Sequence, residues 1–349
     1  MTYSRTNTSQ SPGPISARSL RAVLLAMAVL LIPDRSPGDV FDEIQIETAL
    51  LGEATAIMEN GRRYTGEFTG IEEGRLRILV FEGAGQIQYS LRIEEIASVR
   101  LPGDEVERAA VELYDAAEYD RAIPLLNALF RQRVSYLEIL DERQEETLVS
   151  LPVAYFETAD YINAVSIARR LLRENGREAH RARLEALMLE GYFRLELYDQ
   201  TAELAREWCS RQDTYPESAI GWALLAELKL REERYEEALW VALQPVAFSG
   251  ARPMEYLDRA YAVAAHSYLA LDAENDGYRL FQEMKEHGLT WPESGDRYAE
   301  TRAHYREIAA AIEEEDKVPG DLEIDARPAN KDLNLPLQHV RKLLLSLPE

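Results

Sequence analysis

The residues of this chain that could perform catalysis form no recognisable catalytic motif. The five histidines are His180, His266, His287, His304 and His339. No two of them stand four residues apart around a helical glutamate, as a zinc protease requires, and no Gly-x-Ser-x-Gly elbow or glycine-rich phosphate loop occurs. Cys209 is the only cysteine, so no intramolecular disulfide can form. The sequence predicts no catalytic residue, no metal site and no cofactor.

Acidic residues dominate the charge of the chain. The 62 aspartates and glutamates outnumber the 39 lysines and arginines, which gives a net charge of −23. Runs such as 313–316 are typical of solvated helix faces, because nothing around them indicates a pocket. A surface of this sign repels polyanions, so nucleic acid is not an expected partner.

A short phrase recurs between residues 103 and 316. It reads Tyr119-Asp120-Arg121-Ala122, Tyr161-Ile162-Asn163-Ala164, Tyr198-Asp199-Gln200-Thr201 and Tyr235-Glu236-Glu237-Ala238. The tyrosines are 42, 37 and 37 residues apart, and such a period is typical of stacked helical units. In the first unit, apolar spacing predicts helices over 105–116 and 119–131, with small residues at their crossing (Ala110 and Ala122) and Ala117 at the turn.

This pattern resembles the tetratricopeptide repeat family, whose unit is a helix–turn–helix of about 34 residues. The resemblance covers roughly residues 103–290, with four units and a degenerate fifth in which Glu274 replaces the tyrosine. It implies a mainly α fold, an α-solenoid, that binds protein partners. Pro152 is expected to kink the first helix of the second unit. The alternative is a plain helical bundle that happens to contain the phrase.

Residues 43–102 follow an alternating pattern instead. Turn signals such as Asn60-Gly61 separate five expected short strands, and Gly66 suits a sharp bend. The layout is similar to SH3-like or Sm-like small β-barrels. The RNA-binding turn of Sm-type barrels is absent, because positions 91–93 read Leu-Arg-Ile. We therefore interpret this segment as a small all-β docking barrel.

The two ends of the chain differ from the middle. Within residues 1–38, Arg18 and Arg21 precede an apolar run over 22–32 that is too short to span a bilayer. This order predicts a signal peptide or an N-terminal anchor, and hence a periplasmic or otherwise exported protein whose membrane association involves only this segment. Residues 292–316 are expected to form a capping helix that ends the repeat array of 103–316. Residues 317–349 are expected to form a linker and a short amphipathic helix.

The family resemblance also implies a binding groove, lined by the exposed residues of each first helix. Aligning the repeated tyrosines gives its candidate residues: Phe156, Phe193, Arg194, Leu230, Arg231, His266 and Leu269. An apolar row beside two arginines predicts that the groove binds an extended or helical protein segment with acidic groups. The open alternative is that the aromatic residues pack against neighbouring helices and that the arginines pair with nearby glutamates.

These observations lead to an interpretation of the whole chain as a non-enzymatic scaffold or adaptor. Its expected partners are other proteins, and its expected setting is a cell-envelope complex. The alternative is an accessory subunit, or an enzyme without a recognisable motif, that acts on cell-wall material.

Overall fold

The computed structural model describes residues 43–82, 85–174, 178–211, 218–248, 254–292 and 298–315 of the chain. It divides into two compact units, Met1–Glu293 and Ser294–Glu349. In the second unit the described element is helix α13 (Ala299–Glu315), within the range expected for the last helix. The predicted export segment, the C-terminal linker and the amphipathic tail lie outside the described residues.

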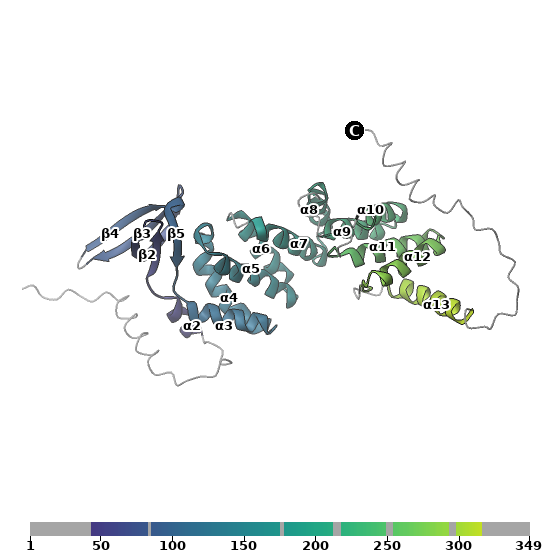
Figure 1. Cartoon of the computed structure of the whole chain (residues 1–349), viewed down its shortest axis with the longest axis horizontal. Coiled ribbons are helices and arrows are strands. Elements are labelled where there is room, and N and C mark those ends of the chain that lie inside the picture. The colour runs from purple at the N-terminus through teal and green to yellow at the C-terminus, as the bar shows by residue number, and fades with distance from the viewer. Residues whose placement is uncertain are drawn as a thin grey trace, which may run out of the picture. The chain divides into compact units, whose positions relative to one another are not determined.

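The first described element of the first unit is a short helix, α2 (Glu43–Leu50), which the sequence did not predict. An antiparallel sheet follows it (Figure 1). The strands are β1 (Ala54–Met58), β2 (Arg63–Glu72), β3 (Arg75–Glu82), β4 (Gly85–Arg92) and β5 (Ile96–Arg100). Their order is β4-β3-β2-β1-β5. The five predicted strands are confirmed, but the predicted closed barrel is wrong. Strands β4 and β5 are opposite edges of the sheet, and no hydrogen-bonded ladder joins them in the described residues.

The sheet stays open because the helical part of the chain covers its apolar residues. Both β2 and β5 contact the 3-10 helix η2 (Val134–Ile139). The hydroxyl of Tyr136 donates to the carbonyl oxygen of Phe68 at 2.9 Å, and the two rings meet edge to face at 5.7 Å between centroids. One core of buried residues extends from Ile46 in α2 through the sheet to Tyr192. In a closed barrel the apolar side chains of the sheet would cover one another. Here the helices help to cover them.

Gly66 allows β2 and β3 to approach closely. A Cβ atom at this position would lie 2.2 Å from the carbonyl oxygen of Leu79. The pairing of the two strands then shifts register between Phe68 and Gly70. A bulge of this kind bends a strand, but it lies after Gly66; at Gly66 itself the structure shows the close approach of β3.

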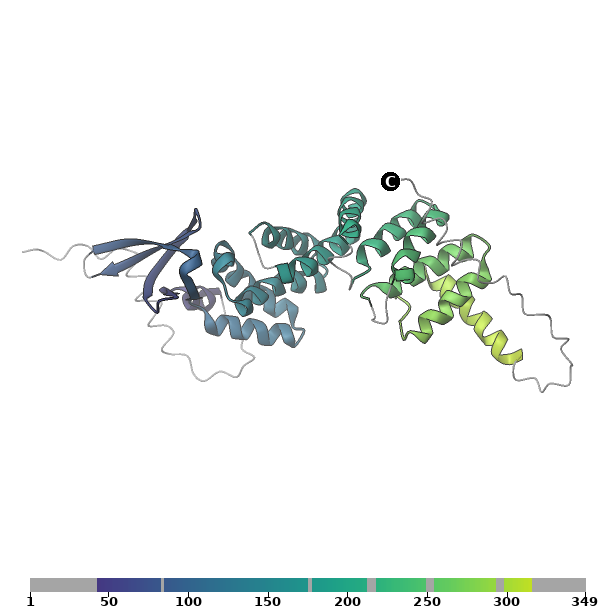
Figure 2. The same cartoon turned by 45° about the horizontal axis from the view of Figure 1, so that its top comes forward.

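Five helix pairs follow the sheet. They are α3 (Asp104–Asp115) with α4 (Tyr119–Arg133), α5 (Glu142–Glu157) with α6 (Tyr161–Arg173), α7 (Glu178–Arg194) with α8 (Tyr198–Ser210), α9 (Ile220–Arg231) with α10 (Tyr235–Phe248), and α11 (Leu257–Ala270) with α12 (Glu274–Glu286). The first helix of each pair contacts the first helix of the next pair, so α3, α5, α7, α9 and α11 form one layer (Figures 1 and 2). Helix α5 runs without interruption through Pro152.

The turn inside each pair has the same backbone geometry every time. One residue per turn adopts a left-handed conformation, with φ between 58° and 61°: Ala117, Ala159, Glu196, Glu233 and Asp272. The next N–H then bonds back five residues, as from Leu197 to the carbonyl oxygen of Tyr192 at 2.9 Å. This is the Schellman arrangement that ends helices. Its fivefold recurrence, including the degenerate fifth unit, confirms a helical repeat and rules out a plain bundle.

An aromatic contact accompanies the first three turns. The ring five residues before each repeated tyrosine meets that tyrosine edge to face, in the pairs Tyr114–Tyr119, Phe156–Tyr161 and Phe193–Tyr198, with centroids 5.6, 5.1 and 5.9 Å apart. Such pairs contribute about 0.5–1.5 kcal/mol beyond the area they bury. The repeated tyrosine therefore fixes the angle at which the second helix leaves the turn.

Candidate functional site

Three charged side chains are buried between the first helices of the last three units. Glu190 in α7, Glu227 in α9 and Arg259 in α11 are 5%, 5% and 7% exposed. The Arg259 guanidinium donates from Nε and Nη2 to the two carboxylate oxygens of Glu227, the second bond measuring 2.9 Å. Its Nη1 donates to Oε2 of Glu190 at 2.5 Å. One arginine thus joins three consecutive repeats through a two-pronged and a single contact.

The electrostatic balance of this cluster requires a fourth residue. Burial by itself lowers the pKa of Arg259, but Glu227 and Glu190 raise it more, so its pKa lies above the ordinary value and the side chain stays charged. Two carboxylates against one guanidinium would leave one negative charge unbalanced. Arg194 supplies the second positive charge, because its Nε donates to Oε1 of Glu190 at 2.8 Å. The Arg194 side chain is 43% exposed, so part of its guanidinium faces solvent.

Arg231 is held differently. Its guanidinium carbon lies 5.1 Å from the ring centroid of Phe193 and 4.8 Å from that of Tyr198. In the described part of the chain no ion pair joins Arg231 to a carboxylate. A guanidinium held by cation–π contacts keeps its N–H donors available for hydrogen bonds. Arg231 therefore presents an oriented positive group with unfilled hydrogen-bonding capacity.

The structure brings three of the seven predicted groove residues together: Phe193, Arg194 and Arg231. It does not provide the exposed apolar row that motivated the prediction, since Phe193 and Leu230 are only 8% and 5% exposed. The low exposure of Phe193 is due in part to its edge-to-face packing on Tyr198. Phe193 and Arg194 thus follow the alternative, in which the aromatic residues pack on neighbouring helices and the arginines pair with glutamates. Arg231 lies neither beside an exposed apolar row nor in an ion pair within the described residues.

The other predicted groove residues lie outside this cluster. Phe156 is partly buried and packs on Tyr161, 5.1 Å between centroids. The His266 ring lies 6.5 Å from that of Tyr235. Leu269 is partly buried near the end of α11. These three residues do not extend the charged surface of Arg194 and Arg231.

Arg259 and Tyr256 were missed by the sequence reasoning. A signal for Arg259 did exist, because Glu190 and Glu227 both stand eight residues before a repeated tyrosine. Two glutamates stacked at one buried position need a cation, and Arg259 is the arginine of α11. Tyr256 precedes that helix with φ of 59°, and burial, aided by Glu190 and Glu255, raises its pKa to about 12.

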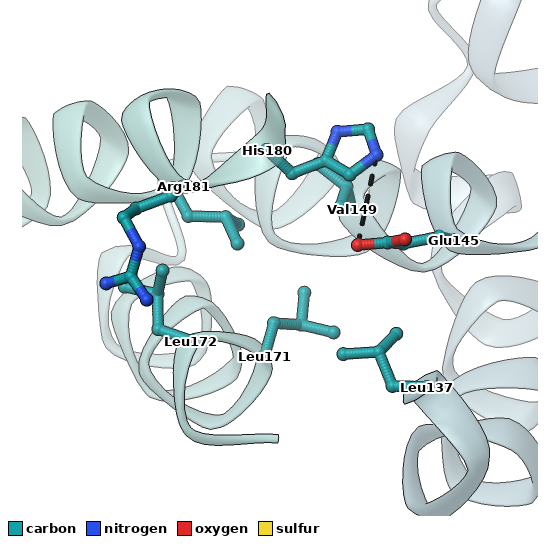
Figure 3. A pocket seen from close by; sticks show the side chains of 8 residues that line it. Leu137, Glu145, Val149, Leu171, Leu172, His180 and Arg181 are labelled. Carbon is teal, nitrogen blue, oxygen red and sulfur yellow. Dashed lines mark ion pairs between the residues drawn. The ribbon is translucent and has the colours of Figure 1, made fainter. Parts of the chain in front are cut away.

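A small pocket beneath α7 is a second candidate site (Figure 3). Its walls come from η2, α5, α6 and α7, and its lining residues are Leu137, Glu145, Val149, Leu171, Leu172, His180, Arg181 and Leu184. The imidazole of His180 points toward Glu145, with Nε2 4.0 Å from Oε1. A histidine–carboxylate pair can activate a nucleophile, but these described lining residues include no serine, threonine or cysteine. We therefore regard the pocket as a packing feature between repeats.

Among the described residues, no group of three or more histidine, cysteine, aspartate or glutamate side chains could hold a metal ion. Within the same residues, no helix has both the length and the apolar character needed to cross a bilayer.

Comparisons with known proteins show likeness of fold only. No family model and no curated protein matches the chain. A crystal structure of MamA protein matches with 13% identity and a TM-score of 0.38, over 52% of this chain and 92% of that one. TTC0263, a thermophilic TPR protein in Thermus thermophilus, matches with 14% identity and a TM-score of 0.38, over 59% of this chain and 98% of that one.

Proposed function

We propose that this protein is a non-enzymatic scaffold that binds an acidic protein segment on the face formed by α7, α9 and α11. The proposal rests on Arg231, whose guanidinium contacts the rings of Phe193 and Tyr198 and forms no ion pair in the described residues. The charges of the neighbouring ionic cluster already balance one another. The guanidinium of Arg259 is already paired with the carboxylates of Glu190 and Glu227. The positive charge that this cluster keeps for a partner is that of Arg231 and of the exposed part of Arg194.

The energetics favour a carboxylate as the group that Arg231 receives. A hydrogen bond to a charged group contributes about 1.5–3 kcal/mol. Because the rings of Phe193 and Tyr198 already restrict the guanidinium, binding costs less side-chain entropy than it would at a free arginine. The net charge of −23 makes this site a local exception on a surface that otherwise repels acidic segments.

The proposed setting is the cell envelope. Its support is the order of basic and then apolar residues before Pro33. Fractionation of the native host tests it: we expect the mature chain, starting near Asp39, outside the cytoplasm. Full-length protein free in the cytosol would contradict the export proposal and leave the binding site unaffected.

Fluorescence anisotropy with labelled peptides tests the binding site. One peptide contains leucine and glutamate, and its matched partner contains leucine and glutamine. We expect the acidic peptide to bind, and Arg231→Gln to weaken binding about tenfold, which corresponds to about 1.4 kcal/mol. Arg234→Gln is the matched control, because Arg234 is an exposed arginine paired with Glu232 and Glu237. Equal binding of the two peptides, or equal effects of the two substitutions, would refute the site.

A further inference from the structure

Strand β4 is an unprotected sheet edge. It pairs with β3 over its whole length, from Glu82 opposite Gly85 to Arg75 opposite Arg92, and no strand in the described residues lies on its other side. An edge strand exposes unpaired N–H and C=O groups, and natural edges are normally guarded by charges, proline or a bulge. From Gly85 to Leu91, β4 carries no charge and no proline, and its ladder with β3 is regular. The opposite edge strand, β5, contacts η2 instead.

The charge distribution indicates what can approach this edge. Residues 54–100 hold six arginines and seven glutamates, a net charge of −1. Residues 101–315 hold 24 basic and 43 acidic residues, a net charge of −19. Two copies of the chain therefore repel one another along their helices but meet no such barrier at the sheet. The sheet is where a second copy can dock without bringing like charges together.

The sequence of β4 is also complementary to itself. In an antiparallel pair centred on Tyr89, Ile87 lies opposite Leu91 of the second copy, and Gln88 lies opposite Ser90 of the second copy. Residues directly opposite share one face of a sheet. Ile87, Tyr89 and Leu91 already share a face with Leu76 and Ile78, as their pairing with β3 shows. This register therefore joins apolar side chains to apolar ones and amides to hydroxyls, and it covers Ile87, now 40% exposed.

We propose that β4 is a self-association surface, at which two copies of this chain pair their β4 strands antiparallel about Tyr89 and form one continuous sheet. Backbone hydrogen bonds satisfy the unpaired groups of both edges. The pairing uses β4, whereas the Arg231 site lies on α9. The dimer would thus present two copies of any segment-binding face, and its existence does not depend on what that face binds.

Sedimentation velocity of the full chain over a dilution series tests the proposal. We expect a concentration-dependent equilibrium between monomer and dimer. In the double variant Gln88→Lys with Ser90→Lys, lysines meet across the interface, so the dimer should weaken at least tenfold, while circular dichroism shows the same secondary structure. Ser98→Lys is the matched control, because Ser98 is an exposed residue of the opposite edge strand. A wild-type chain that is monomeric at every concentration, or a double variant that dimerises like the wild type, would overturn the proposal.

Disulfide cross-linking tests the register and does not depend on the folding of the lysine variants. Opposite residues of an antiparallel pair have Cα atoms about 4.5–5.5 Å apart, which suits a disulfide. Burial raises the pKa of the native Cys209 thiol to about 12, so it contributes little background. With copper phenanthroline as oxidant, an equal mixture of Gln88→Cys and Ser90→Cys proteins should cross-link faster than either protein alone. Cross-linking of Ser98→Cys protein at the same rate would contradict pairing through β4.

Discussion

Replacing Arg259 with methionine isolates the buried ionic cluster. The substitution keeps an apolar side chain of similar length but leaves Glu190 and Glu227, each 5% exposed, without their shared cation. Removing one partner of a buried ion pair costs about 3–5 kcal/mol. The cation–π contact between Arg259 and Phe193, 5.0 Å from guanidinium carbon to ring centroid, is lost as well. Arg194→Met is the comparison, because its side chain is 43% exposed and such a pair contributes about 0–1 kcal/mol.

Urea unfolding followed by tryptophan fluorescence measures both variants. All four tryptophans lie between positions 208 and 291, so their emission reports the repeats around the cluster. This matters because repeat arrays can unfold in segments. We expect Arg259→Met to lower the free energy of unfolding of this region by about 3–5 kcal/mol, and Arg194→Met to lower it by no more than about 1 kcal/mol.

A third variant separates the loss of charge balance from the loss of packing. Adding Glu190→Gln and Glu227→Gln to Arg259→Met removes both buried carboxylates, of which Glu227 has lost its cation and Glu190 keeps only Arg194, and we expect most of the stability to return. The reasoning is refuted if Arg259→Met costs less than about 1 kcal/mol, which is the range of an exposed pair. It is refuted equally if the triple variant is no more stable than Arg259→Met alone.

Three further predictions concern single positions. Glu196→Gly should raise the free energy of unfolding by up to about 1 kcal/mol, because glycine tolerates the φ of 58° at this turn. Glu203→Gly, at an exposed position in the middle of a helix, should lower it by about as much, and the urea midpoints of the two variants test this. Gly66→Ala should cost at least about 1–3 kcal/mol in thermal unfolding, because its Cβ would lie 2.2 Å from the Leu79 oxygen. Burial raises the pKa of the Cys209 thiol from 9.0 to about 12. The stability that the protonated thiol contributes is therefore complete below pH 9 and is lost as the pH rises toward 12. Cys209→Ala should flatten the pH dependence of the free energy of unfolding over that range.

Sequence alone determined the features that depend on neighbours along the chain. The repeated tyrosine phrase, which ends in alanine in three units and in threonine in the third, located the second helix of each of the first four units. Those helices begin at Tyr119, Tyr161, Tyr198 and Tyr235. Alternating residues and turn signals located the five strands for the same reason, since side-chain periods of two and of three to four are local properties. The sequence singled out Gly66 as a bend residue, but the role that the structure shows for it, the close approach of β3, was not predicted.

Only the tertiary structure decided which surfaces are covered and which charges meet. The predicted barrel is an open sheet because η2, more than thirty positions after the last strand begins, packs against β2 and β5. Phe193 is buried because it belongs to a core that it shares with Trp208 of α8 and Leu224 of α9. Arg259 binds carboxylates 32 and 69 residues earlier in the chain. Periodicity determines which face of a helix points inward. Which residues that face contacts depends on how the repeats stack, and stacking involves residues that are far apart in the sequence.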